Sequence, residues 1–281
     1  MANIQIVLDS TAHALPKWLL GHPCVHIASL TVEVGGKEYE EDQLSTEELF
    51  ALMNSSASHP KTSQPPPGTF LSIYESLLKD ECDIIVITLA EALSGTVQSA
   101  ILARELCSKP LRVHVVDSVT TAIGMIKLAE YVMAAAERGQ SVTNILQGLS
   151  SAVSATHTYF LPGTLDFLYK GGRIGGAAAL VGSILQIRPV LYLAQGKVTV
   201  LEKVRTRRRA IDKLVDQITK MPSFAYLGIV HIANEEEAEQ LAKRLSALFP
   251  TVPVIISTAG SVLAAHLGPG LLGVIFQEKV L

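Results

Sequence analysis

The stretch Asp83-Ile84-Ile85-Val86-Ile87-Thr88-Leu89 decides the fold of this chain. Its apolar side chains are continuous instead of alternating, which predicts a strand buried on both faces. Ser94-Gly95-Thr96 comes next and opens a predicted helix from Val97 to about Cys107. A buried strand followed by a helix is the repeating unit of a parallel sheet that is covered by helices on both faces.

The same alternation extends to both sides of this stretch in the first half of the chain. Strands are predicted at residues 4–8, 24–32 and 112–116, and a helix at residues 121–138. Another helix begins near Ser45, which is expected to be its N-cap, with Glu48 closing a capping box. These elements predict a parallel-sheet α/β domain over residues 1–155.

Residues 156–281 show a different pattern. Strand-like runs at 189–194 and 197–203 flank Gln195-Gly196, which is a β-hairpin signal. A helix of small residues is predicted from Ala177 to about Leu185, a basic helix from about Thr206 and another helix at 234–248. Further strands are predicted at 224–232, 252–257 and 272–276. The sequence therefore predicts a second α/β domain, with a mixed sheet.

The composition restricts the possible partners and compartment. The 281 residues carry a net charge of -3 with a sequence pI of about 6.2, so nucleic acid is not expected as a partner. Three scattered cysteines without a CxxC pair indicate neither a zinc site nor a disulfide framework, and a reducing cytoplasm is expected. No stretch approaches the roughly 18 to 20 apolar residues of a membrane-spanning helix, and the N-terminus does not resemble a signal peptide. The 48% of hydrophobic residues fits a large α/β core, or such a core with an added apolar ligand cavity.

Hydroxyl-rich segments stand where the predicted strands of the first half end. In a parallel sheet, ligands bind beyond the carboxyl ends of the strands. Such side chains also form N-caps and turns, so each segment alone has two interpretations. Four of them in one half favour a binding site: Asp9-Ser10-Thr11, the loop at Thr62, Ser94-Gly95-Thr96 and Asp117-Ser118.

The loop Thr62-Ser63-Gln64-Pro65-Pro66-Pro67-Gly68 is expected to be stiff, because proline fixes φ and has no N–H. It contains no carboxylate, cysteine or histidine, so it suits a small anion or a polar head group better than a metal or acid–base chemistry. The chain also lacks a GxxxxGK(S/T) loop, a GxGxxG after the first strand, HExxH and GxSxG. No catalytic residue, metal or cofactor is predicted.

The second half contributes further candidates. Arg173 lies between two glycine pairs and could reach the crevice, or could be a surface arginine in a flexible loop. His266 precedes Gly-Pro-Gly, where it could bond a ligand or be structural. Lys203, Arg205 and residues 207–209 form a basic run that is either a solvated face or a docking surface for an acidic partner.

The ordered set of these motifs resembles the DegV family from end to end. The family is similar in fold to the substrate-binding subunit of dihydroxyacetone kinase. The resemblance implies two α/β domains with a long-chain fatty acid between them, in a FakB-type subunit that presents the carboxylate to a separate ATP-binding kinase. It rests on these segments: 9–11, 62–65, 93–96, 117–118, 171–174, 202–206 and 266–270.

The resemblance also implies roles for single residues. Thr62 and Ser94 would hold the carboxylate, and the ligand-binding set extends to their neighbours Ser63, Gly95 and Thr96. Arg173 and His266 would lie close to the head group, with Arg173 tied more to the phosphorylation step. Lys203 and Arg205 would lie near the partner kinase. Pro66 stands where the family usually has Ser or Thr, so the polar network behind the carboxylate is expected to differ.

The size of the hydrophobic effect favours a lipid of about C14 to C18 over a small acid, because about 14 methylenes gain roughly 11 kcal/mol on burial. Two other classes of function stay open at this point. One is a phosphotransferase subunit of the dihydroxyacetone-kinase type, or a hydrolase, acting at the same crevice. The other is a regulatory module that binds only through the basic face at residues 205–209.

Overall fold

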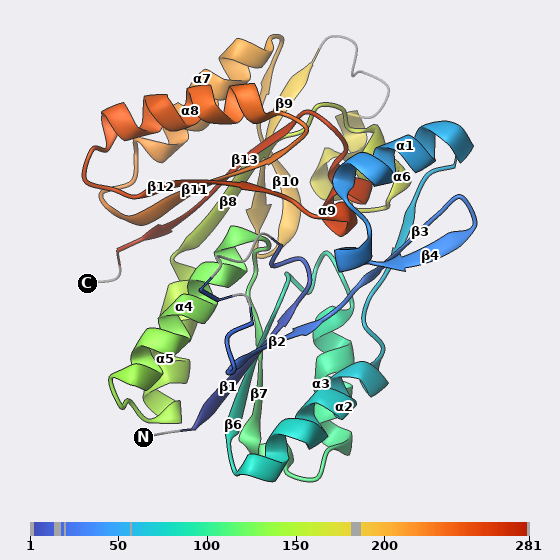
Figure 1. Ribbon diagram of the computed structural model, residues 1–281. Helices are drawn as coiled ribbons and strands as arrows, with labels where there is room; N and C mark the ends of the chain where they lie inside the picture. Colours follow the sequence, from blue (N-terminus) through green and yellow to red (C-terminus); the bar gives the residue numbers. More distant parts are fainter. Residues whose placement is uncertain (1–2, 14–17, 20, 57, 181–186, 280–281) are drawn as a thin grey trace.

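The computed structural model describes residues 3–13, 18–19, 21–56, 58–180 and 187–279. Within these residues the strands form three sheets. Figure 1 shows the two larger sheets in separate parts of the molecule, the first in the lower part of the view and the second in the upper part.

The first sheet is parallel. It contains, in spatial order, β2 (Val25–Ala28), β1 (Ile4–Asp9), β6 (Asp83–Thr88) and β7 (Val113–Asp117). One face is covered by α2 (Pro67–Leu77) and α3 (Thr96–Leu106), the other by α4 (Ile123–Glu137) and α5 (Val142–Ser154) (Figure 1). Ile84 and Val86 of β6 pack with α2 and α3, while Ile85 and Ile87 pack with α4 and α5. The predicted parallel sheet with helices on both faces is confirmed.

The second sheet is mixed, as predicted. Its order is β10 (Lys197–Val204), β9 (Arg188–Ala194), β8 (Thr156–Leu161), β13 (Leu271–Glu278), β11 (Phe224–Ile232) and β12 (Val254–Thr258). β11 and β12 run parallel, and the other neighbours run antiparallel. α7 (Arg207–Ile218) and α8 (Glu235–Leu248) cover one face. The other face packs with side chains of the first half, among them Ala122 and Ile123.

β9 and β10 form the predicted hairpin around Gln195-Gly196. Both turn residues have positive φ, 49° at Gln195 and 76° at Gly196. A two-residue turn with positive φ at both positions matches the twist of the flanking strands, and glycine adopts this conformation without steric cost.

The sequence pattern does not predict the third, antiparallel sheet, which joins β4 (Lys37–Glu40), β3 (Thr31–Val34) and β5 (Lys61–Ser63) in that order. The prediction of one strand over residues 24–32 is wrong, because the chain leaves the first sheet after Ala28. The N–H of Leu30 then donates to Ser10 Oγ at 2.9 Å instead of to a neighbouring strand.

α1 (Thr46–Ser56) begins with the predicted capping box. The N–H of Glu48 donates to Ser45 Oγ at 3.2 Å, and the N–H of Ser45 donates to Glu48 Oε2 at 3.0 Å. The remaining described helices are α6 (Asp166–Lys170), α9 (Ser261–Leu267) and the 3-10 helices η1 (Glu41–Gln43), η2 (Leu78–Asp80), η3 (Pro110–Arg112) and η4 (Gly175–Leu180). Of the small-residue helix predicted from Ala177, the part up to Leu180 is 3-10, and residues 181–185 lie outside the described residues.

Glu41 ties the first half of the chain to α9. The residue is 2% exposed, and its carboxyl group accepts the hydroxyl of Ser10 at 2.5 Å and the N–H of Val262 at 3.2 Å. Burial raises the pKa of Glu41 to about 8, although both hydrogen bonds act to lower it. The carboxyl group is therefore largely protonated at neutral pH, and it fixes the start of the helix that carries His266.

Candidate functional site

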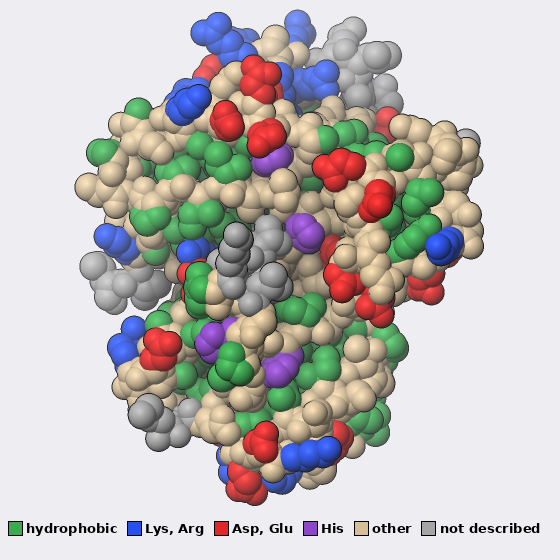
Figure 2. Space-filling model, in the orientation of Figure 1, with side chains coloured by type: hydrophobic (Ala, Val, Ile, Leu, Met, Phe, Trp, Pro, Cys, Tyr) green, Lys and Arg blue, Asp and Glu red, His purple; other side chains and the backbone are tan. Residues whose placement is uncertain are grey.

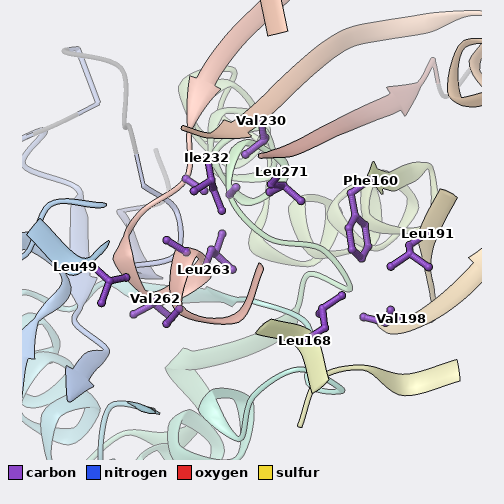
Figure 3. Packing of buried hydrophobic residues seen from close by; sticks show 14 of the residues in the cluster. Leu49, Phe160, Leu168, Leu191, Val198, Val230, Ile232, Val262, Leu263 and Leu271 are labelled. Carbon is purple, nitrogen blue, oxygen red and sulfur yellow. The ribbon is translucent and has the colours of Figure 1, made fainter. Parts of the chain in front are cut away.

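An apolar cavity is lined by both halves of the chain. Leu30 and Leu89 contribute from the first half, and Phe160, Leu168 and Leu263 from the second. Figure 3 shows the last three side chains within one cluster of packed apolar residues. The cavity volume is about 840 Å³ with its open mouth included.

Thr62 and His266 meet on the wall of this cavity although they lie 204 residues apart. Thr62 is in β5 and His266 is in the last turn of α9; Thr62 Oγ1 lies 2.7 Å from His266 Nε2. Burial lowers the pKa of His266 to about 4, and the charges of Arg173 and His59 act in the same direction. The imidazole is therefore neutral at pH 7 and can donate or accept, depending on its tautomer.

The backbone at Gly171 holds the other side of the His266 ring. A Cβ at this position would stand 2.3 Å from His266 Nδ1, so the ring packs directly against the glycine. This nitrogen is buried and has no hydrogen-bond partner among the described residues. The close approach explains why a residue without a side chain stands at the end of α6.

Arg173 reaches from the second half of the chain to the first. Its Nε donates to the carbonyl oxygen of Leu93 at 3.0 Å, and its Nη1 donates to that of Gly171 at 2.7 Å. Leu93 directly precedes Ser94, so the guanidinium group lies at the loop that follows β6. The structure thus brings this arginine to the crevice.

Ser94 lines the cavity, and its Oγ lies 2.9 Å from Thr96 Oγ1. Thr96 is fully buried and, like Gly95, is not among the lining residues, while Ser63 is exposed on β5. Of the seven ligand-binding residues that the sequence predicts, the structure therefore places four on the cavity wall: Thr62, Ser94, Arg173 and His266.

Gln64 belongs to the predicted stiff loop but not to the predicted ligand-binding residues, and it joins this loop to α3. Its Nε2 donates to Ser99 Oγ at 2.8 Å. Its amide also covers Gly95, where a Cβ would stand 2.2 Å from Gln64 Oε1. The signal that could have found Gln64 is its place between Ser63 and the proline run.

Two of the four hydroxyl-rich segments form turns. The Asp9 carboxylate accepts the N–H of Thr11 at 3.0 Å and that of Leu89 at 2.6 Å. Asp117 accepts the N–H of Val119 at 2.9 Å. For these segments the interpretation as turn-forming residues fits the structure, whereas Thr62 and Ser94 reach the cavity.

Pro66 lies at the N-cap of α2 and is exposed. With φ -65° and ψ 154° it precedes Pro67, the first residue of the helix. A serine or threonine at this place would cap the helix, which contributes about 1 kcal/mol. The departure at Pro66 therefore changes the helix cap, and the position gives no support to the expected change in the polar network behind the ligand.

The basic run divides into two groups. Lys203 and Arg205 are exposed and form no ion pair with another described residue. Arg207 instead turns inward and binds Glu237, with Arg207 Nη2 at 2.8 Å from Glu237 Oε2. Figure 2 shows lysine and arginine side chains gathered at the top of the molecule, over α7. The part of the run that is available to a partner is thus smaller than the sequence pattern indicates.

Among the residues described, no group of three or more His, Cys, Asp or Glu side chains is placed to hold a metal ion. None of the described helices has the length and hydropathy needed to cross a membrane. The three cysteines, Cys24, Cys82 and Cys107, are free thiols.

The chain is similar to known proteins over nearly its whole length. Residues 3–279 match the family described as "Uncharacterised protein, DegV family". A DegV domain-containing protein of Clostridium perfringens is 32% identical over 286 residues, which cover 98% of this chain and 99% of the relative. A structure described as "Fatty Acid Binding of a DegV family Protein from Thermus thermophilus" has a TM-score of 0.90 at 30% identity and covers 99% of this chain and 100% of its own. The structure of DegV, described as a fatty acid binding protein from Bacillus subtilis, has a TM-score of 0.87 at 30% identity with the same coverage. The chain belongs to the DegV family.

Proposed function

We propose that this protein binds a long-chain fatty acid between residues 1–155 and 156–281, with the carboxylate at Thr62 and Ser94. The observation that carries this proposal is the convergence of two hydroxyls, an arginine and a neutral histidine on the wall of an apolar cavity. The DegV proteins of Thermus thermophilus and Bacillus subtilis, which are described as fatty acid binding, support it.

The polar groups suit a carboxylate because a buried charge needs hydrogen-bond donors and an opposite charge. Thr62 and Ser94 supply hydroxyl donors. With its single proton on Nε2, the neutral imidazole of His266 donates to Thr62 Oγ1 and leaves the hydroxyl proton of Thr62 free for the carboxylate. Arg173 supplies the positive charge. α2 and α3 begin close to Thr62 and Ser94 in the chain, and the positive ends of their dipoles add to this potential.

The apolar wall suits an acyl chain. Burial of about 14 methylenes gains roughly 11 kcal/mol, which offsets the ordering of the chain. The cavity volume of about 840 Å³, with the mouth included, lies in the range of ligand-binding pockets.

We further propose that the protein is a cytoplasmic carrier, which presents the carboxylate to a separate kinase for acyl-phosphate formation. Lys203 and Arg205 are exposed near the end of β10 and offer a positive surface to an acidic partner. The free thiols fit a reducing compartment.

The geometry of His266 favours a carrier over a phosphotransferase subunit of the dihydroxyacetone-kinase type. That chemistry requires a histidine nitrogen that can bond covalently to a small ketone. Here Nε2 is hydrogen-bonded to Thr62 and Nδ1 is packed against Gly171, so neither nitrogen is open to a ketone. Incubation with dihydroxyacetone is expected to leave the intact mass unchanged.

Mass spectrometry of an organic extract tests the main proposal. The protein is purified, denatured and extracted, and a bound fatty acid of about C14 to C18 is expected, in line with the burial of its methylenes. The delipidated protein is then expected to take up added palmitic acid. A clean extract together with no uptake would contradict the proposal.

Substitution of Gly171 by alanine is expected to weaken fatty-acid binding about tenfold, the effect of one lost hydrogen bond in the site. The new Cβ would stand 2.3 Å from His266 Nδ1 and 3.0 Å from the carbonyl oxygen of Phe167, so the ring must shift from its present position and its hydrogen bond with Thr62 is disturbed. Titration calorimetry with palmitic acid measures the loss. Gly68→Ala is the control, because no atom lies within 4 Å of its new Cβ. Equal affinities of the two variants would show that the position of His266 does not matter.

A further inference from the structure

The cavity wall carries a polar group that the proposed carboxylate site does not use. Thr121, in the loop between β7 and α4, lines the cavity and is 8% exposed. Its hydroxyl has no hydrogen-bond partner among the described residues. A buried hydroxyl without a partner is costly, so its presence in an apolar wall calls for a partner on the ligand.

A second hydroxyl of the same wall has hydrogen-bonding capacity left. Thr158, in β8, also lines the cavity and is 8% exposed. Its Oγ1 lies 2.7 Å from Thr120 Oγ1, and this pair uses only one of the two hydroxyl protons. Thr121 and Thr158, one from each half of the chain, thus both place a hydroxyl in the cavity wall.

The start of α4 adds donors at this place. Thr121 directly precedes Ala122, the N-cap, and Ile123, the first residue of a helix of 15 residues. Ala122 and Ile123 are 1% and 4% exposed, and Ala122 lines the cavity. The N–H groups of Gly124 and Met125 donate to the carbonyl oxygens of Thr121 and Ala122 at 3.0 Å, so among the described residues those of Ala122 and Ile123 are the ones left without a backbone partner. The helix dipole favours an oxygen acceptor there.

The charge of the wall decides what kind of oxygen fits. Arg173 is the one residue with a charged side chain among the described lining residues, and it belongs to the proposed carboxylate site. A second carboxylate on the ligand would therefore be buried near Thr121 without a cation, which is very costly. An uncharged hydroxyl can accept from Thr121 or α4 and donate to Thr158, so it satisfies groups that a methylene would leave unpaired.

We propose that Thr121, together with Thr158 and the start of α4, binds a hydroxyl group carried on the acyl chain. The preferred ligand is then a hydroxylated long-chain fatty acid. This inference rests on the proposed fatty-acid function and specifies the substrate class of the same site.

Delipidated protein is titrated with palmitic acid and with a set of hydroxypalmitic acids that differ only in the carbon that carries the hydroxyl. At least one positional isomer is expected to bind about tenfold more tightly than palmitic acid, because its hydroxyl pairs with a buried group that is otherwise unpaired. Thr121→Val is expected to remove this preference while palmitic acid still binds. Thr121→Ser is expected to keep it.

Thr88→Val is the matched control. The hydroxyl of Thr88 is also buried and without a partner among the described residues, but Thr88 does not line the cavity, so the preference is expected to persist. Palmitic acid that binds as tightly as every isomer would overturn the inference and leave the fatty-acid function standing. A preference that survives Thr121→Val would overturn it as well. If neither palmitic acid nor any hydroxypalmitic acid binds, both the proposed fatty-acid function and this inference are contradicted. If Thr121→Val does not fold, Thr158→Val takes its place, and an undiminished preference in that variant overturns the inference.

Discussion

Replacement of Thr62 by valine and Ser94 by alanine in the same chain is expected to lower the affinity for palmitic acid at least a hundredfold. Each hydroxyl is proposed to donate a hydrogen bond to the carboxylate, and a hydrogen bond to a charged group contributes about 1.5–3 kcal/mol. The loss of both corresponds to a factor of about 10² to 10⁴ in the dissociation constant. Thr62→Val also removes the hydrogen bond with His266 Nε2, so the imidazole of His266 is no longer held in position. Titration calorimetry on delipidated protein measures the change.

Ser63→Ala is the control for this pair. Ser63 neighbours Thr62 in β5, but it is exposed and does not line the cavity, so its loss is expected to leave the affinity unchanged. Thermal unfolding of each variant separates weak binding from a loss of fold. Wild-type affinity in the double variant would remove both hydroxyls from the carboxylate site.

Replacement of Arg207 by alanine is expected to lower the free energy of unfolding by about 1.5–3 kcal/mol, the contribution of hydrogen bonds to a charged group. Its side chain is 24% exposed and forks onto Glu237, with Nε and Nη2 at 3.0 and 2.8 Å from Oε2. It also donates to the carbonyl oxygens of Leu161 at 3.1 Å and Gly270 at 2.9 Å. Burial alone would raise the pKa of Glu237, but the hydrogen bonds from Arg207 and Asn234 outweigh it, and the pKa is lowered. Alanine at position 207 would leave the Glu237 carboxylate without the arginine that forms most of its hydrogen bonds.

Urea unfolding measures this loss, and Arg208→Ala is the matched control. Arg208 is the next residue, is exposed and forms no ion pair with another described residue, so its loss is expected to change stability by less than about 0.5 kcal/mol. Arg207→Lys keeps the charge but not the planar fork, and it is expected to recover only part of the loss. Equal effects at positions 207 and 208 would mean that the pair with Glu237 contributes nothing.

The elements whose pattern is local could be predicted from the sequence. The apolar run at residues 83–89 is continuous because helices cover both faces of β6, and the hairpin at Gln195-Gly196 follows from the positive φ that its turn requires. The third sheet could not be predicted, because the apolar pattern continues through residues 24–32. What breaks the strand is the bond from Leu30 N–H to Ser10 Oγ, which joins residues 20 apart.

The candidate site could be predicted only in part. Hydroxyls after strands pointed to Thr62 and Ser94, but the same signal at Asp9 and Asp117 belongs to turns, and only the fold decides which groups face the cavity. Thr62 and His266 lie 204 residues apart in the chain, so no local spacing in the sequence indicates that they are in contact. Arg207 likewise looks like its basic neighbours in the sequence.

The position of β13 has a consequence for the order in which the protein folds. β13 lies between β8 and β11, and its partner β8 precedes it by far in the chain; His157 and Glu278 at their ends lie 121 residues apart. The first sheet can assemble from residues 4–117, whereas β8 keeps an unpaired edge until β13 has been made, and such long-range pairing is slow. His266 lies just before β13 in the chain and forms the hydrogen bond with Thr62. A ligand held by both residues would therefore stabilise the finished fold and give no help to the chain while it is still assembling.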